Sequence, residues 1–328
     1  MKRNWKNFTL GLVGFAAAAA LGTTWAAPAN AANVPESDEP IKLAMNEWTG
    51  QHITTQIAGE ILKRAGYTVE YVTAGYFPQW QALADGTLTA SLEIWSNNVG
   101  DNWEKAEASG NVVKLGDLGL DTNEGWMYPK HVAELCPGLP DWKALADCAE
   151  TLATSDTFPN GRILSYPADW GTRSADIIAG LDIPFEAVPA GSEGALVAEL
   201  KSAVAKKEPL VMMFWAPHWV FAEVDVDWVA LPKYDAACAE DASWGPNPNK
   251  TNDCGVDVAN TFKVAWVGMK DKWPVAHKFL SDFQMSAPDQ EPMMKAVDVD
   301  GEDLQAVVKA WVDANEATWK PWLDAAMQ

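Results

Sequence analysis

From residue 41 onward, apolar and polar positions alternate between a strand pattern and a helix pattern. Residues 41–45 form a short apolar run typical of a buried strand, and the apolar positions within 53–64 recur at helical spacing. Gly66 ends this helix, and 67–73 has the composition of a second strand. This order predicts a β-α-β unit, in which ligands bind beyond the carboxyl ends of the parallel strands.

The same alternation continues through the chain and predicts an α/β fold in two domains. We expect a strand at 125–129 to leave the first domain and 229–232 to return to it. The first domain is then discontinuous, 32–126 plus 233–328, and the second covers 127–232. The other predicted strands are 90–95, 162–166 and 209–215, and the other predicted helices are 80–85, 173–179, 196–204, 274–283 and 304–324.

The first 31 residues have the three parts of a secretory signal peptide. Three basic residues precede an apolar, Ala-rich stretch at 8–21, and Ala29-Asn30-Ala31 fits a cleavage site made of small residues. The apolar stretch is shorter than a membrane-spanning helix. We therefore expect export to the periplasm, with 1–31 removed as a signal peptide.

The four cysteines agree with export to an oxidising compartment. All of them follow the predicted cleavage site, and three pairings are open to them. We favour Cys136–Cys148 and Cys238–Cys254, because each pair closes a short loop rich in Pro, Gly and Asp. No Cys or His spacing typical of a zinc site is present.

The net charge excludes two classes of partner. The chain holds 45 acidic and 24 basic residues, and its net charge of −21 becomes −24 without the three basic residues of the leader. Nucleic acid and anionic membrane surfaces both need a basic surface, which this composition does not supply. We expect a protein that acts as a monomer on a small ligand.

Tryptophan is abundant, with 18 in 328 residues, and four of these are placed in a similar way. Trp48, Trp95, Trp170 and Trp215 end or follow predicted strands, two in each domain, so we expect them to face one cleft. A Trp ring attracts a cation that donates no hydrogen bonds, such as a methylated ammonium group. A Trp ring also stacks on sugars or fills a core, and the residues alone leave these alternatives open.

These motifs resemble the glycine betaine/choline family of periplasmic substrate-binding proteins, which serve ABC importers. The resemblance covers 41–325, and its strongest parts are Trp95 after a strand, Trp170-Gly171, and Phe214-Trp215-Ala216-Pro217-His218-Trp219. It implies a type II, two-lobed binding protein that closes on its ligand about a two-segment hinge. It also implies a Trp box around a quaternary ammonium, no enzymatic activity, and the membrane subunits of an importer as partners.

One stretch departs from the betaine-binding pattern. Betaine binders usually place a His shortly after the position of Trp95, where this chain has Ser96-Asn97-Asn98-Val99. Acids stand near the Trp motifs instead, and they would repel a ligand carboxylate. We therefore expect trimethylamine N-oxide first, choline second and glycine betaine third, which makes the chain most similar to the members that bind the N-oxide. The predicted ligand contacts are Trp48, Trp95, Trp170, Trp215, Glu47, Glu124, Trp126 and Asp169.

A loop and several acids allow other interpretations. Asn247, Asn249, Thr251 and Asp253 place oxygen-bearing side chains at alternate positions, as a calcium loop does, but the acidic first position and the closing Glu are missing. No cofactor is required, and calcium is a candidate structural ion. Acids beside Trp would also suit a carbohydrate-binding protein or a glycoside hydrolase. No sequence motif of a serine hydrolase, P-loop or zinc protease accompanies them.

Overall fold

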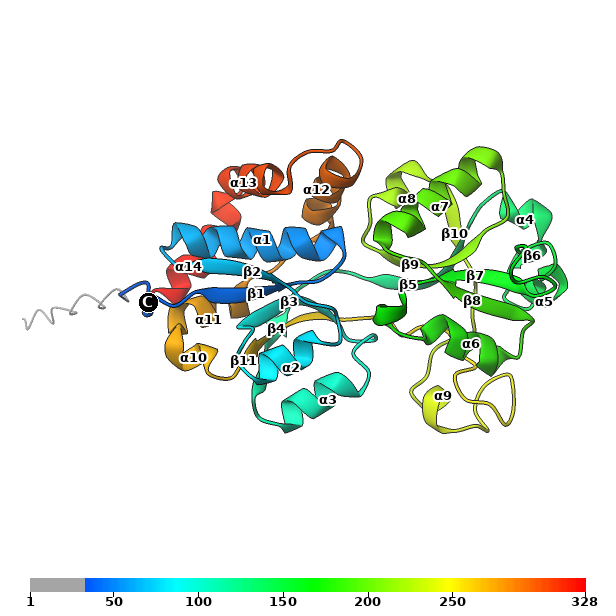
Figure 1. Cartoon of the computed structure of the whole chain (residues 1–328), viewed down its shortest axis with the longest axis horizontal. Helices are drawn as coiled ribbons and strands as arrows, with labels where there is room; N and C mark the ends of the chain where they lie inside the picture. The colour runs from blue at the N-terminus through cyan, green and yellow to red at the C-terminus, as the bar shows by residue number, and fades with distance from the viewer. Residues whose placement is uncertain (1–32) are drawn as a thin grey trace, which may run out of the picture. The chain divides into compact units, whose positions relative to one another are not determined.

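The computed structural model describes residues 33–328, so the predicted signal peptide, 1–31, lies outside the described residues. Two five-stranded sheets organise this part of the chain, and helices cover both of them (Figure 1). We call the first sheet with its helices lobe I and the second sheet with its helices lobe II. The predicted two-lobed α/β fold is confirmed. Within 33–328, no helix combines the length and the apolar character needed to cross a membrane.

The sheet of lobe I has the strand order β2-β1-β3-β11-β4. Strands β1 (Ile41–Met45), β2 (Val69–Thr73) and β3 (Ala90–Trp95) are parallel, so their carboxyl ends share one edge. Strand β11 (Thr261–Trp266) runs antiparallel between β3 and β4 (Val112–Asp117). The sequence pattern predicted β1, β2 and β3 but missed β11 and β4.

Helices enclose this sheet on both faces. Helix α1 (Thr49–Arg64) packs on β1 and β3 and against α12 (Ala287–Asp298) and α13 (Leu304–Ala314). Figure 1 shows α1 on one side of the sheet and α2 (Gln79–Ala84) with α3 (Asp101–Ala108) on the other. The remaining helices of lobe I are α10 (Met269–Lys272), α11 (Pro274–Asp282) and α14 (Glu316–Ala326).

The single helix predicted at 304–324 is wrong, because the structure contains two helices there. Helix α13 ends and α14 begins at Asn315, whose φ of −114° and ψ of 30° are not helical. The Asn315 side chain donates from Nδ2 to the carbonyl oxygen of Trp311. Asn forms such local hydrogen bonds in competition with the helix ladder, which explains why the break occurs at this residue.

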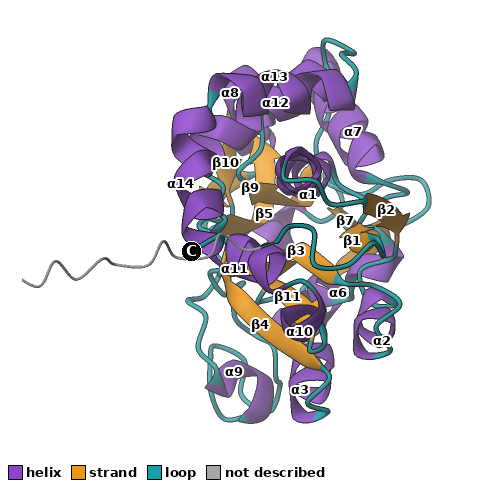
Figure 2. Ribbon diagram, turned by 90° about the vertical axis from the view of Figure 1, so that its left-hand side faces the viewer, coloured by secondary structure: helices purple, strands orange, loops and turns teal. Residues whose placement is uncertain are grey.

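The sheet of lobe II has the strand order β10-β5-β9-β7-β8. Strand β5 (Asn123–Pro129) is antiparallel to β9 (Val211–Ala216) and β10 (Val226–Trp228), while β7 (Gly161–Ser165) is parallel to β9 and β8 (Phe185–Pro189). Figure 2 shows the strands of the molecule enclosed between helices. The other elements of lobe II are α4 (Val132–Leu135), β6 (Pro137–Pro140), α5 (Ala144–Cys148), the 3-10 turn Ala168–Trp170, α6 (Arg173–Leu181), α7 (Glu193–Lys206) and α8 (Val220–Glu223).

The chain crosses between the lobes twice, once from β4 to β5 and once from β10 to β11 (Figure 1). The first crossing enters β5 at Asn123, where Glu124 pairs with Trp215 of β9. Residues at the start of β5 therefore lie next to a crossing segment and next to a predicted box residue.

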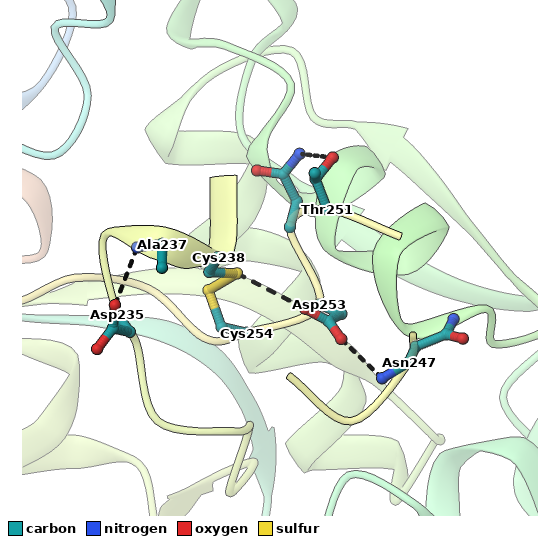
Figure 3. Close-up of a disulfide and its surroundings, with 8 residues drawn as sticks. Asp235, Ala237, Cys238, Asn247, Thr251, Asp253 and Cys254 are labelled. Atoms are coloured by element: carbon teal, nitrogen blue, oxygen red, sulfur yellow. Dashed lines mark hydrogen bonds between the residues drawn. A yellow bond between two sulfur atoms is a disulfide. The ribbon is translucent and has the colours of Figure 1, made fainter. Parts of the chain in front are cut away.

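Both favoured disulfides are present, and Figure 3 shows the second one. Cys238, in α9 (Ala237–Glu240), is joined to Cys254, and the loop between them reaches α6 through Asn247, whose Nδ2 donates to the Gly180 carbonyl at 2.8 Å. Gly180 is needed here because a Cβ atom would meet the Asn252 backbone at 2.4 Å. The loop therefore packs on lobe II, although the predicted boundary at 233 assigned it to the first domain.

Candidate functional site

A cavity between the lobes is lined by six aromatic residues and two polar ones. The space between its atoms is about 370 Å³, counted with the solvent at its open side. All four tryptophans predicted to form a box contribute to it. We call it the aromatic cavity, and its lining residues are Trp48, Tyr76, Trp95, Asn98, Glu124, Tyr166, Trp170 and Trp215.

The four tryptophans reach the cavity because each stands at or shortly after a strand end. Trp48 is the N-cap residue of α1, just after β1, and Trp95 is the last residue of β3. In lobe II, Trp170 ends the 3-10 turn that follows β7, and Trp215 is the next-to-last residue of β9. The two lobes thus present their strand edges to the same space, as open α/β sheets do at ligand sites.

Rings from the two lobes contact each other edge to face. The centroids of Trp48 and Trp170 are 5.6 Å apart at 71°, and those of Trp170 and Trp215 are 5.7 Å apart at 69°. Tyr166 lies 5.5 Å from Trp170 and 5.6 Å from Trp215. Edge-to-face pairs at such distances are attractive, so the aromatic side chains form one continuous lining across the two lobes.

Glu93 lies beneath the two tryptophans of lobe I and is 1% exposed. Its Oε1 accepts hydrogen bonds from Nε1 of Trp48 at 2.7 Å and from Nε1 of Trp95 at 3.3 Å. Its Oε2 accepts from Oγ1 of Thr54 at 2.8 Å and from Nε2 of Gln290 at 2.9 Å. Burial raises the pKa of Glu93, and these hydrogen bonds act against that rise. The carboxylate therefore holds both indoles in place.

Glu124 is the acid that lines the cavity. It is buried, and it accepts hydrogen bonds from Nδ2 of Asn97 and from Nδ2 of Asn98, the latter at 3.1 and 3.3 Å. Asn97 and Asn98 follow β3 in lobe I, while Glu124 belongs to β5 of lobe II. The predicted Glu124 therefore lies at the cavity and also joins the two lobes.

Two tyrosines complete the lining and were missed by the sequence analysis. The Tyr76 hydroxyl donates to the Trp95 carbonyl at 3.2 Å and accepts from its backbone N–H at 3.1 Å. The Tyr166 hydroxyl lies at the cavity beside Glu124. Burial raises the pKa of Tyr166 well above its usual value, and the charge of Glu124 and a hydrogen bond to its side chain add to the rise. Tyr166 therefore keeps its proton.

A cation also reaches this region from lobe II. Arg173 opens α6, and its guanidinium donates to the carbonyl oxygen of Asn97 in lobe I. Its charge acts to lower the pKa of both Tyr76 and Tyr166 against the larger effect of burial. The sequence analysis found no cation in the stretch after Trp95, but the fold brings one to that stretch from a distant motif.

Further hydrogen bonds join the lobes at the start of α1. The backbone N–H of Thr49 donates to Oε2 of Glu193 at 2.8 Å, and its hydroxyl donates to Oδ1 of Asp298 at 2.7 Å. Trp219 of lobe II donates from Nε1 to Oδ2 of the same Asp298 at 2.9 Å. The structure thus has polar contacts between the lobes beside Trp48, which is next to Thr49 in the chain.

Three predicted contacts do not line the aromatic cavity. Trp126 is fully buried within lobe II, where its Nε1 donates to the Ser174 hydroxyl at 3.1 Å. Glu47 and Asp169 are exposed, although each precedes a lining tryptophan in the sequence. Partial burial raises the pKa of Glu47, and the charge of Asp169 adds to the rise. The two acids therefore lie near each other outside the lining.

The candidate calcium loop uses its acid internally. The buried Asp253 accepts from the backbone N–H of Asn247 at 2.7 Å (Figure 3). The Asn247 side chain is turned to the Gly180 carbonyl. Asn249 and Thr251, the other two predicted ligands, lie in the same disulfide-closed loop. Calcium binding in this loop stays a prediction.

The described residues bring a second set of metal-ligand types together, namely Glu193, His218 and Asp298, with ligand atoms within 4.8 Å of one another. The backbone N–H of Val220 donates to Nδ1 of His218 at 3.2 Å, so the ring proton belongs on Nε2. Nε2 then donates to Oε1 of Glu193, also at 3.2 Å. A proton occupies the position that a metal would need, so this group is a hydrogen-bonded cluster.

The comparison with known families decides the class of this protein. A family model described as the substrate binding domain of an ABC-type glycine betaine transport system matches residues 39–314. The chain belongs to this family. Its relatives are substrate-binding components of transporters, so the protein is a binding protein and not an enzyme, as the sequence predicted.

Relatives in this family bind different methylated amines. The trimethylamine N-oxide-binding protein of Pelagibacter ubique (strain HTCC1062) is 28% identical over 304 residues, which cover 90% of this chain and 94% of the relative. The glycine betaine/proline betaine-binding periplasmic protein of Salmonella typhimurium is 23% identical, over 94% of this chain and 97% of the relative.

Solved structures of the family share the two-lobed fold. An ABC-transporter choline-binding protein in complex with choline superposes with a TM-score of 0.71 at 22% identity, covering 89% of this chain and 93% of its own. Lactococcal OpuAC, closed with glycine betaine, gives a TM-score of 0.68 at 19% identity, covering 89% and 100%. At these identities the likeness shows the fold and does not identify a ligand.

Proposed function

We propose that this protein captures a methylated amine, trimethylamine N-oxide first, in the aromatic cavity and delivers it to the membrane subunits of an ABC importer. We further propose that it works in the periplasm as a monomer. The observation that carries the proposal is the cavity itself, with four Trp, two Tyr and one buried carboxylate around a small space. The N-oxide-binding relative supports the choice of ligand.

The lining suits a cation that forms no strong hydrogen bonds to water. Each desolvated Trp face attracts such a cation by about 0.5–2 kcal/mol. The rings are already packed against one another across the lobes, so little ordering is needed on binding. At the upper end of this range, four faces and one polar contact would give about −8 kcal/mol, which corresponds to roughly micromolar binding.

The polar groups favour a ligand without a carboxylate. Glu124 lies in the lining and would repel the carboxylate of glycine betaine, although Arg173 nearby offsets part of that repulsion. The Tyr166 hydroxyl, which keeps its proton, is a donor in the lining that suits the oxygen of an N-oxide. Choline, whose hydroxyl can donate to Glu124, ranks second, and glycine betaine third.

Isothermal titration calorimetry on the protein without residues 1–31 tests this order. We expect roughly micromolar binding of trimethylamine N-oxide, weaker binding of choline and the weakest binding of glycine betaine. Micromolar betaine binding with no heat from the N-oxide would overturn the order. Binding of glucose or maltose, with no response to any methylated amine, would overturn the proposed function and favour a carbohydrate-binding protein.

A further inference from the structure

Glu93 is the most completely buried acid near the aromatic cavity, yet it does not line it. It stands two residues before Trp95 on β3, and α1 and α12 supply the other groups around it. Its charge raises the pKa of Tyr76, which lines the cavity, as the charge of Glu124 also does. Glu93 therefore acts electrostatically on a residue of the cavity.

The hydrogen bonds around Glu93 favour its ionised form. Each of its two oxygens lies within hydrogen-bond distance of two donors. The indole nitrogens of Trp48 and Trp95 and the amide nitrogen of Gln290 cannot accept a proton in return. Only the Thr54 hydroxyl could accept one, by reversing its hydrogen bond. All four hydrogen bonds therefore oppose the rise in pKa that burial causes.

No cation of the described residues pairs with this carboxylate. Its partners are two indoles, a hydroxyl and an amide, and the salt bridges among residues 33–328 do not include it. Burying a charge without a counter-charge is costly even when hydrogen bonds satisfy it. A cationic ligand between the rings of Trp48 and Trp95 would bring the missing positive charge to the other side of the same indoles.

We propose that Glu93 determines specificity as a buried counter-charge that acts through the indoles of Trp48 and Trp95. By accepting both indole protons, the carboxylate withdraws positive charge from the N–H edges and leaves the ring faces more negative. It also adds a direct attraction for the positively charged methylated nitrogen of the ligand in a region shielded from water. This proposal rests on the proposed function, because it assumes that the cavity takes a methylated ammonium group.

The test separates the effect of the ligand's charge on affinity from the effect of its shape. Choline and 3,3-dimethyl-1-butanol have nearly the same shape, but the second carries a neutral tert-butyl group in place of the trimethylammonium group. Calorimetry with the wild-type protein and with Glu93→Gln would give the affinity ratio of the two compounds. We expect Glu93→Gln to lower the ratio at least tenfold, mainly through choline, while the neutral compound changes less than threefold. An unchanged ratio would overturn the proposal.

Two control variants test whether the change in the affinity ratio comes from the charge of Glu93. Thr54→Val removes one hydrogen bond to Glu93 but keeps its charge, so the ratio should stay within about threefold of the wild type. Glu70→Gln removes an exposed charge on β2, outside the cavity lining, and should change neither compound. If Thr54→Val lowers the ratio as far as Glu93→Gln does, Glu93 is only a structural support and the proposal is wrong.

A measurement on the wild type keeps the proposal testable if Glu93→Gln does not fold. The 13C shift of the Glu93 carboxyl carbon at pH 7 should be that of a carboxylate in the choline complex, and a protonated carboxyl there would overturn the proposal. The two hypotheses fail differently. A wild-type protein that binds no methylated amine ends the proposed function, whereas one that binds choline with an unaltered ratio in Glu93→Gln ends only the role of Glu93.

Discussion

The two sides of the aromatic cavity hold their tryptophans by different means. In lobe I, Trp48 and Trp95 donate their indole protons to a buried carboxylate. In lobe II, Trp215 stacks on Phe214 at 4.6 Å and 21°. Trp170 packs edge to face on the rings of Trp48, Tyr166 and Trp215, and its indole lies beside Glu47. One side is fixed by hydrogen bonds to a buried carboxylate and the other mainly by ring packing.

This difference predicts that the two lobes have different roles in ligand binding. A hydrogen bond fixes both the position and the rotation of a ring, whereas packing of rings tolerates small shifts. Lobe I would then present rigid rings to the ligand cation, and the rings of lobe II would adjust their positions when the ligand binds. Trp170 is half-buried in a short turn, whereas the other three are buried.

The largest expected loss of ligand affinity is the same for a tryptophan of either lobe. Trp95→Ala and Trp215→Ala should each weaken binding of the preferred methylated amine at least about tenfold, because each removes a whole ring face. Calorimetry measures the loss, with Trp322→Ala as a control, since this half-buried Trp of lobe I packs on Phe283 away from the cavity. If Trp215→Ala keeps wild-type affinity, only lobe I binds the ligand and the comparison fails.

A smaller effect should separate the two sides. Trp48→Phe and Trp215→Phe both keep an aromatic ring in a nearly equally buried place, but only Trp48→Phe deprives Glu93 of a donor. A buried charged acceptor that loses a partner costs about 1–3 kcal/mol. Urea unfolding should therefore show Trp48→Phe to be less stable than Trp215→Phe by about that amount. Equal stabilities would mean that the Glu93 hydrogen bonds are not what distinguishes the lobes.

The smallest effect on binding is expected at a second buried charge of lobe I. Lys263 on β11 is fully buried and donates to the carbonyl oxygens of Ser281 and Phe283, and burial lowers its pKa from 10.5 to about 8. Between those values the unfolded chain holds more protons, so stability should rise with pH from about 8 to 10.5. This contribution is on the order of 2 kcal/mol.

Lys263→Met should lose that rise while binding the ligand as the wild type does, because Lys263 does not line the cavity. Urea unfolding at pH 8 and at pH 10.5, with calorimetry at pH 7, measures both properties. A loss of affinity in Lys263→Met would show that any buried charge in lobe I affects the site. The effect of Glu93→Gln on ligand binding would then not be specific to Glu93.

Strand-end reasoning located the box tryptophans, because Trp48, Trp95 and Trp215 close strands or follow them directly. Tyr166 obeys the same rule, since it follows β7, and it could have been chosen from the sequence. Tyr76 stands three residues after β2, as Trp48 does after β1, and could have been chosen by the same rule. Trp126 was predicted to contact the ligand, but its side chain, two residues after Glu124 on β5, is buried inside lobe II.

The sequence could not show what Glu93 and Arg173 do. Glu93 is one acid in an apolar strand, and three of its four donors come from two distant segments, α1 with its N-cap and α12, that only the fold brings together. Arg173 reaches the stretch after Trp95 from the other lobe. Long-range contacts of this kind leave no periodicity in the chain, whereas β1, β3 and α1 follow from local patterns and were predicted well.

The hydrogen bond between the Thr49 backbone and Glu193 has a consequence for selection among ligands. The amino terminus of a helix attracts anions, and that of α1 opens directly beside Trp48. In this protein, Glu193 of lobe II already occupies that terminus. Glu193 therefore competes with an acidic ligand for this helix terminus. A zwitterion such as glycine betaine would have to displace Glu193 before its carboxylate could bind there.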